Sequence, residues 1–299
     1  MEFDRAQKIR QVINEYGEDK FYLSFSGGKD STILSRFIDI ALPGNKIPRV
    51  FADTGIEFND IRKFVLGIAE NDDRFCIIHP SVNVRDALER DGYPFKSKDH
   101  ALKVQMYQKG SKSKRVKEYA KGGGKFNCPK ILMYQFTPEN KLKISDECCV
   151  NMKENPLKSW GNKNGRPIAI LGTRRAEGGR RNRLTCLSFK GKNLKAFQPF
   201  APVSDEFEEY LIEKYDIPIC RLYHEPFNFD RTGCKGCPFA LHLQEELDTL
   251  QRFFPNERAQ CEIIWKPVYD EYRRLGYRLR KDDGQINMFD NKKQGDLGA

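Results

Sequence analysis

A short run of serine, glycine and lysine near the amino terminus has the composition of a phosphate-binding loop. It reads Ser-Gly-Gly-Lys-Asp-Ser over residues 26–31, between an apolar run over 21–25 that predicts a strand and an amphipathic run over 30–42 that predicts a helix. Gly27 and Gly28 allow the backbone to approach an anion closely. The start of the helix would add unpaired N–H groups, and Lys29 a positive charge. This context favours a phosphate cradle over an ordinary Gly-Gly turn, and the spacing excludes the Walker loop.

Two close pairs of cysteines could bind a metal. Cys148 and Cys149 are adjacent, and Cys234 and Cys237 form a Cys-x-x-Cys motif much later in the chain. Four thiolates can enclose a zinc ion or an iron–sulfur cluster, and residue type alone favours zinc. Two unrelated buried pairs are the remaining interpretation. A shared metal would attach a C-terminal segment to the main fold.

Five arginines follow an apolar run over residues 168–171. They are Arg174, Arg175, Arg180, Arg181 and Arg183. Guanidinium groups this close repel one another unless an anion lies between them or they spread into solvent. The run therefore predicts either an anion site or a solvated basic loop.

The segment 96–125 is strongly basic. It holds ten Lys or Arg against Asp99 and Glu118, so it accounts for most of the net charge of +10. Together with Tyr107, Tyr119 and Phe126, these residues suit a nucleic acid or another large anion. A flexible solvated loop is an equally good interpretation, and we expect the part of the segment that ends in the glycines at 122–124 to be a mobile loop.

Apolar periodicity predicts an α/β fold. The expected strands cover residues 21–25, 47–52, 75–79, 168–172 and 194–197, and the expected helices cover 5–16, 30–42, 59–70, pieces of 84–108, 148–160, 205–215, 241–253 and 257–275. The alternation implies an open, mostly parallel twisted sheet with helices on both faces, followed by a C-terminal helical segment. We expect a nucleotide-binding domain over 1–240 with a basic insertion at 96–127, a helical extension over 241–280 and a disordered tail over 281–299.

The composition is typical of a globular enzyme that does not bind membranes. Hydrophobic residues make up 39% and charged residues 31% of the chain. The first residues lack an apolar signal core, and no apolar run is long enough to cross a bilayer. We therefore expect a cytoplasmic protein. In a reducing compartment, nine cysteines favour metal or redox chemistry over disulfides.

Residues 26–31 resemble the phosphate loop of the adenine nucleotide alpha-hydrolase (PP-loop, N-type ATP pyrophosphatase) superfamily. Residues 53–58 resemble the Asp-Thr-Gly-x-x-Phe of its phosphoadenylyl-sulfate (PAPS) reductase branch, although Asp-Thr-Gly is also an ordinary turn. The resemblance implies a Rossmann-like fold that binds an adenylyl nucleotide (ATP, adenylyl sulfate (APS) or PAPS), with Mg²⁺ as a companion ion. The residues expected beside the nucleotide are Ser24, Ser26, Gly27, Gly28, Lys29, Asp30, Ser31, Asp53, Thr54, Gly55 and Gly172.

The cysteines and arginines resemble those of cluster-bearing APS reductases. Residues 148–157 fit Cys-Cys-x-x-x-Lys-x-x-Pro-Leu, and residues 172–181 fit Gly-x-Arg-x-x-Glu-x-x-x-Arg. The resemblance implies a [4Fe-4S] cluster on Cys148, Cys149, Cys234 and Cys237. It also implies three catalytic residues: Lys153 between the cluster and an anionic substrate, and Arg174 and Arg181 facing the phosphosulfate.

The resemblance covers residues 20–95 and 145–240, and the chain departs from the family in three ways. Sulfonucleotide reductases end in Glu-Cys-Gly-Leu-His, whose cysteine attacks the sulfate sulfur, whereas no cysteine follows Cys261 here. Val203 stands where relatives carry tryptophan. The basic segment resembles nothing in the small reductases.

Three functions are compatible with these features. The first is a sulfonucleotide reductase-like oxidoreductase that takes electrons from a reductant such as thioredoxin. The second is a sulfurtransferase, similar to the DNA-phosphorothioation enzymes of the superfamily, that uses ATP and a sulfur donor protein to modify a nucleic acid held by residues 96–125. The third is a non-enzymatic, cluster-bearing nucleotide sensor or nucleic-acid-binding protein.

Overall fold

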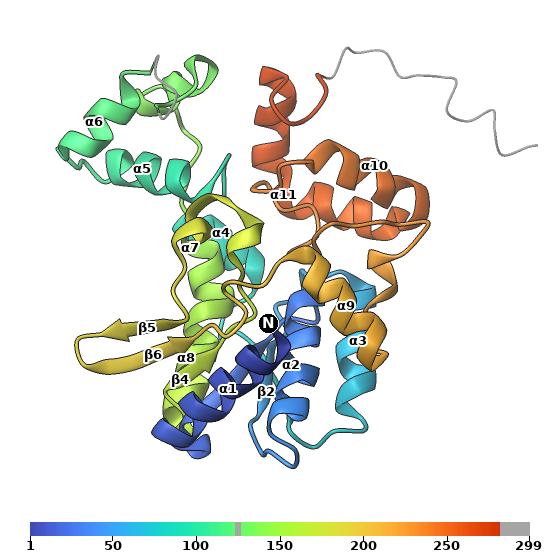
Figure 1. Cartoon of the computed structure of the whole chain (residues 1–299). Coiled ribbons are helices and arrows are strands. Elements are labelled where there is room, and N and C mark those ends of the chain that lie inside the picture. The colour runs from blue at the N-terminus through green and yellow to red at the C-terminus, as the bar shows by residue number, and fades with distance from the viewer. Residues whose placement is uncertain (123–126, 282–299) are drawn as a thin grey trace, which may run out of the picture.

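A six-stranded sheet forms the centre of the fold (Figure 1). The computed structural model describes residues 1–122 and 127–281. The strands are β1 (Phe21–Phe25), β2 (Arg49–Ala52), β3 (Phe75–Ile78), β4 (Ile168–Ile170), β5 (Leu187–Lys190) and β6 (Asn193–Phe197), in the order β3-β2-β1-β4-β6-β5. Neighbouring strands are parallel, except that β5 pairs with β6 in antiparallel fashion. The expected open, mostly parallel sheet is confirmed, and β5 is an edge strand that the apolar pattern did not indicate.

Helices surround this sheet. They are α1 (Glu2–Tyr16), α2 (Lys29–Ala41), α3 (Asn59–Ala69), α4 (Val84–Asp91), α5 (Lys98–Gln108), α6 (Lys114–Ala120), α7 (Glu147–Cys149), α8 (Asn155–Lys163), α9 (Asp205–Tyr215), α10 (Leu243–Phe253) and α11 (Pro255–Leu275). A π-helical turn, Val150–Glu154, joins α7 to α8. Most of these helices lie within a few residues of the ranges expected from the sequence, and the C-terminal helices α10 and α11 are present as expected.

Both faces of the sheet are covered, because its central strands are apolar on both sides. In β1, Tyr22 packs edge-on against Trp160 of α8, with ring centroids 5.8 Å apart. Successive strand residues point to opposite faces, so Phe21 and Leu23 project away from α8. The connections that run from β1 to β2 through α2 and from β2 to β3 through α3 place these helices on that second face. The doubly covered sheet therefore matches the expected fold class.

The basic segment is folded rather than extended. We expected a mobile loop after residue 108, but residues 114–120 form α6, and a 3₁₀ segment, Lys130–Phe136, follows further on. Local charge repulsion is outweighed by packing, since Val116 and Tyr119 are buried against α5. The loop prediction is therefore wrong for α6, and Gly123 and Gly124 lie outside the described residues. We call α5, α6 and Lys130–Phe136 the basic arm; it projects from the body in Figure 1.

The core of the basic arm is a buried histidine. The two ring nitrogens of His100 lie 3.0 Å from the hydroxyl of Tyr119 and 2.6 Å from Oε1 of Gln135. Burial lowers the pKa of His100 to about 4, below its ordinary value of 6.5. At a pH between these two pKa values, His100 binds a proton in the unfolded chain but not in the folded chain. The free energy of unfolding therefore decreases as the pH falls through this range.

We expect the folded protein to lose on the order of 2 kcal/mol through His100 between neutral pH and about pH 4.5. Denaturant unfolding at both pH values would measure this loss for the native chain and for His100→Gln. Groups common to both proteins cancel in the comparison, so the variant should show a flatter pH dependence. Equal pH dependence in the two proteins would contradict the prediction.

Among the described residues, we find no helix with the length and apolar character needed to cross a bilayer. The tail expected to be disordered over 281–299 lies, apart from residue 281, outside the part of the chain that the structure describes.

Candidate functional site

The expected phosphate loop lies at the carboxyl end of β1, immediately before α2. Gly27 has a φ of +73°, and a Cβ there would come within 2.8 Å of Ile61 in α3, so a glycine is required. The Ser31 hydroxyl donates to the Gly28 carbonyl at 3.0 Å and lies 3.0 Å from the Ser26 hydroxyl, which closes the turn. The sequence therefore placed this loop in its correct context, between a strand and a helix.

A cleft of about 960 Å³ opens over this loop. Its walls include Ser24, Ser26, Gly28, Lys29, Asp30 and Ser31, the loop after β4, and the segment 228–233. Gly172 packs directly on the start of α2, since a Cβ there would lie 3.2 Å from the carbonyl of Asp30. Open α/β sheets bind ligands at this edge, outside the carboxyl ends of their strands. Of the residues expected beside a nucleotide, Gly27, Asp53, Thr54 and Gly55 do not line the cleft.

Two positive charges of the cleft, Lys29 and Arg174, contact acidic side chains of α9. Nζ of Lys29 lies 3.0 Å from Oε1 of Glu209. The buried guanidinium of Arg174 pairs with Asp30 at 3.2 Å, Asp205 at 2.8 Å and Glu208 at 2.9 Å. Burial raises the pKa of Glu208 to about 9, and Asp30 adds to the shift, whereas Arg174 opposes it. Arg174 and Arg181, both expected to be catalytic, line the cleft.

The segment after β2 positions another residue instead of lining the cleft. Asp53 pairs with Arg62 of α3 at 2.7 Å. The backbone N–H and the hydroxyl of Thr54 donate to the carboxylate of Glu57, at 2.9 and 2.8 Å. Glu57, buried in turn, lies 3.0 Å from Nζ of Lys153. Thr54 of the Asp-Thr-Gly segment therefore fixes Glu57, and Glu57 holds Lys153.

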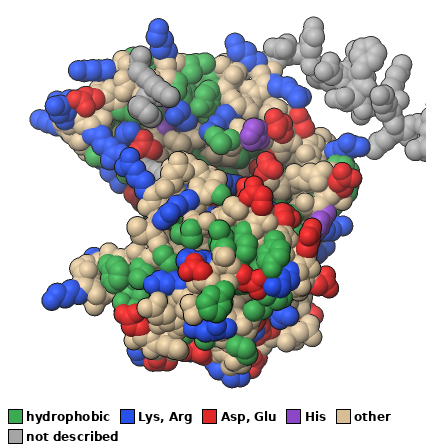
Figure 2. Space-filling view, in the orientation of Figure 1, with side chains coloured by type: hydrophobic (Ala, Val, Ile, Leu, Met, Phe, Trp, Pro, Cys, Tyr) green, Lys and Arg blue, Asp and Glu red, His purple; other side chains and the backbone are tan. Residues whose placement is uncertain are grey.

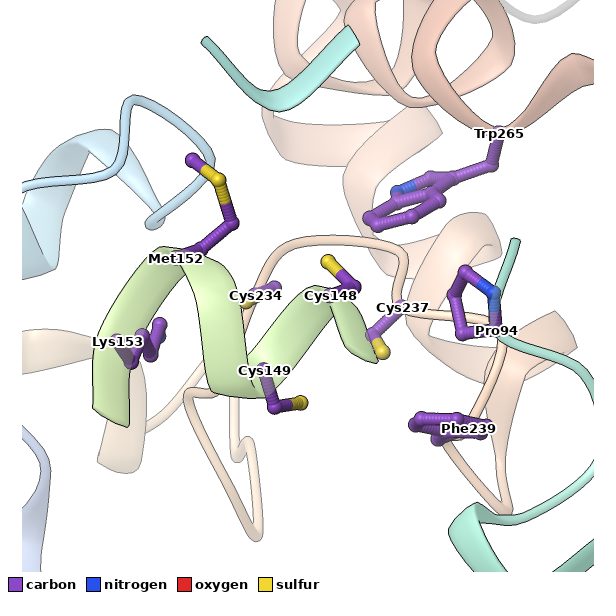
Figure 3. Close-up of a pocket in the computed structure, with 9 residues that line it drawn as sticks. All are labelled: Pro94, Cys148, Cys149, Met152, Lys153, Cys234, Cys237, Phe239 and Trp265. Carbon is purple, nitrogen blue, oxygen red and sulfur yellow. The ribbon is translucent and has the colours of Figure 1, made fainter. Parts of the chain in front are cut away.

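All four expected metal ligands line a second, smaller pocket (Figure 3). Cys148 and Cys149 come from α7, where the π-helical turn bends the chain, and Cys234 and Cys237 come from the loop before α10. All four cysteines are free thiols. Burial raises the pKa of Cys234 to about 11, and Lys153 partly offsets this. Burial also raises the pKa of Cys148 and Cys237.

The structure gathers these thiols without arranging them as a metal site. In residues 1–122 and 127–281, no group of three or more His, Cys, Asp or Glu side chains is placed so that it could hold a metal ion. The donor set nevertheless fits a thiophilic metal, because four thiols from two segments surround one space and no carboxylate lines it. Cys148, Cys149, Cys234 and Cys237 are therefore brought together, whereas metal binding stays a prediction.

Lys153 lies between the two pockets. It lines both the cysteine pocket and the cleft over the phosphate loop. Although burial opposes its charge, Cys234 and Glu57 raise the pKa of Lys153 above its ordinary value. The side chain therefore carries a fixed positive charge where a group bound by the cysteines and an anion in the cleft would meet.

The C-terminal helices hold the Cys-x-x-Cys loop by its backbone. In α11, the indole of Trp265 donates to the carbonyl of Lys235 at 3.0 Å, the hydroxyl of Tyr269 donates to that of Gly236, and the hydroxyl of Tyr272 donates to that of Pro238 at 2.9 Å. On the other side of the loop, the Lys235 N–H donates to the carbonyl of Ile56 at 2.9 Å. This loop therefore joins the C-terminal helices to the segment that follows β2.

Several residues of the site were not singled out in the sequence. The hydroxyl of Tyr223 accepts the N–H of Lys29 at 3.1 Å and lies 2.5 Å from the hydroxyl of Thr232. The acidic residues Asp205, Glu208 and Glu209 recur at the spacing of one helical face, which is the signal that could have indicated their common target. Nothing local in the sequence points to Tyr223.

A strand that leads into a Gly-Gly loop, with a cleft over the carboxyl edge of a mostly parallel sheet, defines an α/β protein with a ligand-binding edge of the kind that open sheets use. Residues 126–240 match the family model described as the phosphoadenosine phosphosulfate reductase domain. This segment of the chain is similar to that domain, and it contains all four cysteines, Lys153 and the arginine run.

A search of curated proteins finds a relative in Methanocaldococcus jannaschii, the uncharacterized protein MJ0973. It is 25% identical over 288 residues, which cover 88% of this chain and 58% of that protein. The chain therefore spans little more than half the length of this relative.

Solved structures with partial likeness include three enzymes. PAPS reductase from Candida auris, in a phosphate complex, has a TM-score of 0.46 at 14% identity and covers 77% of this chain and 87% of its own. The FMN adenylyltransferase of Candida glabrata has a TM-score of 0.45 at 12% identity, and the match covers 78% of this chain and 60% of that enzyme. The U34-tRNA thiolase NcsA of Methanococcus maripaludis, with its [4Fe-4S] cluster, has a TM-score of 0.38 at 13% identity, with 95% and 82% covered.

Proposed function

We propose that this protein is an enzyme of sulfur chemistry that binds an adenylyl nucleotide in the cleft and uses a [4Fe-4S] cluster on its four paired cysteines. The observation that carries the proposal is the position of Lys153, which borders both the cleft and the cysteine pocket. An ammonium group placed there stabilises negative charge that develops between the two pockets. The match of residues 126–240 to the PAPS reductase domain supports this class of chemistry.

Each part of the cleft has a role in this proposal. The phosphate loop and the start of α2 receive the phosphates, with Lys29 as the charge partner. Arg174 and Arg181 face the activated end of APS, PAPS or ATP, and Asp30, beside the phosphate loop, would bind a Mg²⁺ ion carried by ATP. Thr54 acts through Glu57, which orients Lys153.

The cysteine pocket would hold the cluster through Cys148, Cys149, Cys234 and Cys237. When bound, a [4Fe-4S] cluster supplies an electron-accepting or sulfur-binding centre next to Lys153. The chain's own contribution is to keep the four thiols free, with Cys148 buried and the other three half-buried, and to hold the Cys-x-x-Cys backbone against α11. A structural zinc ion is the alternative occupant of the same donors.

Two reactions fit this site. Reduction of APS or PAPS would release sulfite and needs a reductant such as thioredoxin. ATP-dependent sulfur transfer to nucleic acid, from a sulfur donor protein, would release pyrophosphate, and the exposed basic arm favours it as the second candidate. A nucleotide sensor without turnover is the non-enzymatic alternative.

Anaerobic purification followed by iron, sulfide and zinc analysis tests the cluster. We expect a brown protein with iron and acid-labile sulfide in equal amounts, and loss of both in a Cys234→Ser variant. A colourless protein loaded with zinc would overturn the cluster. The holoprotein would then be assayed for sulfite from APS or PAPS with thioredoxin, and for pyrophosphate from ATP with added DNA or tRNA. Nucleotide binding without release of sulfite or pyrophosphate would support the non-enzymatic nucleotide sensor.

Changing Lys29 to alanine tests the phosphate loop. We expect the variant to bind the nucleotide about tenfold more weakly, because one charged phosphate contact is lost. Calorimetric titration would measure the affinity, and Arg36→Ala, exposed on the same helix, is the matched control. Unchanged affinity in Lys29→Ala would show that the loop does not hold the phosphates.

A further inference from the structure

We propose that the basic arm and the β5–β6 hairpin, two projections that extend from the walls of the cleft, together form a binding surface for single-stranded nucleic acid. The proposal goes beyond the nucleotide chemistry above, because it requires neither nucleotide turnover nor a cluster. It follows from the exposed charges on two separate projections and from the way each projection is joined to the cleft.

The basic arm presents positive charge that the rest of the protein does not neutralise. Its exposed basic residues are Lys98, Lys109, Lys112, Lys114, Arg115, Lys117, Lys121 and Lys130. Four of these residues pair with acidic side chains: Lys98 with Glu154, Lys109 with Glu147, Lys114 with Glu118 and Arg115 with Asp99. Within the described residues, the other four, Lys112, Lys117, Lys121 and Lys130, form no ion pair. Holding several unpaired lysines on a rigid helical unit raises the local positive potential, which attracts a polyanion.

The arm is also built to keep its shape. Nζ of Lys103 lies 3.9 Å from the centre of the Tyr119 ring, and Tyr119 contacts the buried His100. These interior contacts keep α5 and α6 together in spite of the charge on their outer faces. Because packing holds α5 and α6 together, a ligand can neutralise their exposed lysines with little cost in ordering these two helices.

The β5–β6 hairpin carries a second group of exposed basic residues. Lys190, Lys192 and Lys195 are exposed, and the hairpin from residue 187 to residue 197 contains no acidic residue. Phe189, beside Lys190, is 52% exposed. An exposed aromatic ring among lysines offers a surface on which an unpaired base can stack. Neither strand pairing nor core packing explains why the Phe189 ring is exposed.

Both projections extend from the walls of the cleft. The arm leads through residues 137–146 into Cys148 and Lys153, and the loop of Gly172, Arg174 and Arg181 leads into β5. Figure 1 shows the arm and the hairpin on the same side of the molecule, and Figure 2 shows the surface hollowed between them, with Lys and Arg side chains on both. A strand that touches both would pass the opening between them.

A nucleic acid fits this surface better than an acidic protein does. The charges are spread along two projections, which suits the regular phosphates of a strand. Phe189 adds a contact that carboxylate side chains would not use. A duplex would neutralise the lysines equally well, but its bases are already paired and stacked and could not stack on Phe189. We therefore assign the surface to a single strand.

Fluorescence anisotropy of a labelled single-stranded oligonucleotide, without nucleotide, tests the proposal on the full chain. We compare an arm variant (Lys112→Glu, Lys117→Glu, Lys121→Glu), a hairpin variant (Lys190→Glu, Lys192→Glu, Lys195→Glu) and a control (Lys20→Glu, Lys46→Glu, Lys63→Glu). The control residues are also exposed, and Lys20 and Lys46 lie at the amino ends of β1 and β2, away from the cleft. All three variants change the net charge equally.

We expect the arm and hairpin variants each to bind at least about tenfold more weakly, with a salt dependence whose log–log slope is smaller by about 2. The control should bind within about twofold of the native chain, because salt screens charges that lie far from the bound strand. Phe189→Ala should weaken single-strand binding about fivefold and leave duplex binding unchanged. Glutamine substitutions at the same lysines provide a second set if a charge-reversed chain fails to fold.

Three results would overturn the proposal. The first is equal loss of binding in the control, because the attraction would then follow net charge and not this surface. The second is duplex binding as tight as single-strand binding. The third is tighter binding of poly-glutamate than of the oligonucleotide, which would indicate an acidic protein partner. Loss of nucleotide turnover alone, with oligonucleotide binding intact, would count against the proposed function and not against this surface.

Discussion

Lys153→Met is expected to lower turnover about 1,000-fold, or about 4 kcal/mol in transition-state free energy. Methionine keeps most of the volume of the side chain but removes the charge between the cleft and the cysteine pocket. Since the proposal assigns the phosphates to the phosphate loop and not to Lys153, nucleotide affinity should change far less than turnover. Sulfite or pyrophosphate release, measured beside calorimetric nucleotide binding, separates the two effects.

Two further variants distinguish catalysis from general damage near Lys153. Lys158→Met removes an exposed lysine of α8 that lies 3.2 Å from Glu154, and it should turn over normally. Glu57→Gln keeps Lys153 but weakens the 3.0 Å ion pair that orients it, so an intermediate loss is expected. Normal turnover in Lys153→Met would remove the central support for the proposed function.

Gly236→Ala is expected to destabilise the protein by about 3 kcal/mol. The residue has a φ of +60°, and a Cβ there would lie 2.8 Å from Sγ of Cys261 and closer still to the hydroxyl of Tyr269. Neither neighbour can withdraw easily, because Cys261 and Tyr269 are buried in α11. The Cys-x-x-Cys turn must therefore shift, which also moves Cys234 and Cys237.

Gly233→Ala is the matched control in the same loop. Its φ is not in the left-handed region, and a Cβ at this position would meet nothing within 4 Å. Denaturant unfolding of both variants, together with iron analysis, measures the difference. We expect Gly236→Ala alone to lose stability and bound iron. Equal stability of the two variants would contradict the packing described for this loop.

Local spacing determined much of the fold. Apolar runs and glycines identified β1, α2, β2, α3 and β3, because each of these elements reports its own burial through its periodicity. The basic segment was predicted less well, since α6 is stabilised by contacts of Val116 and Tyr119 that no local pattern shows. The edge strand β5 was missed for a similar reason: it is exposed at its end and depends on pairing with β6.

The sequence by itself identified the chemical groups of the candidate site: a phosphate loop, an arginine run, two cysteine pairs and Lys153. Only the tertiary structure decided how they meet. It placed Lys153 between two pockets, directed Asp53 toward Arg62, and gave Glu57 the role of holding Lys153. The physical reason is that residue types report what a side chain can bind, whereas the partner of a charge or thiol depends on packing between segments far apart in the chain.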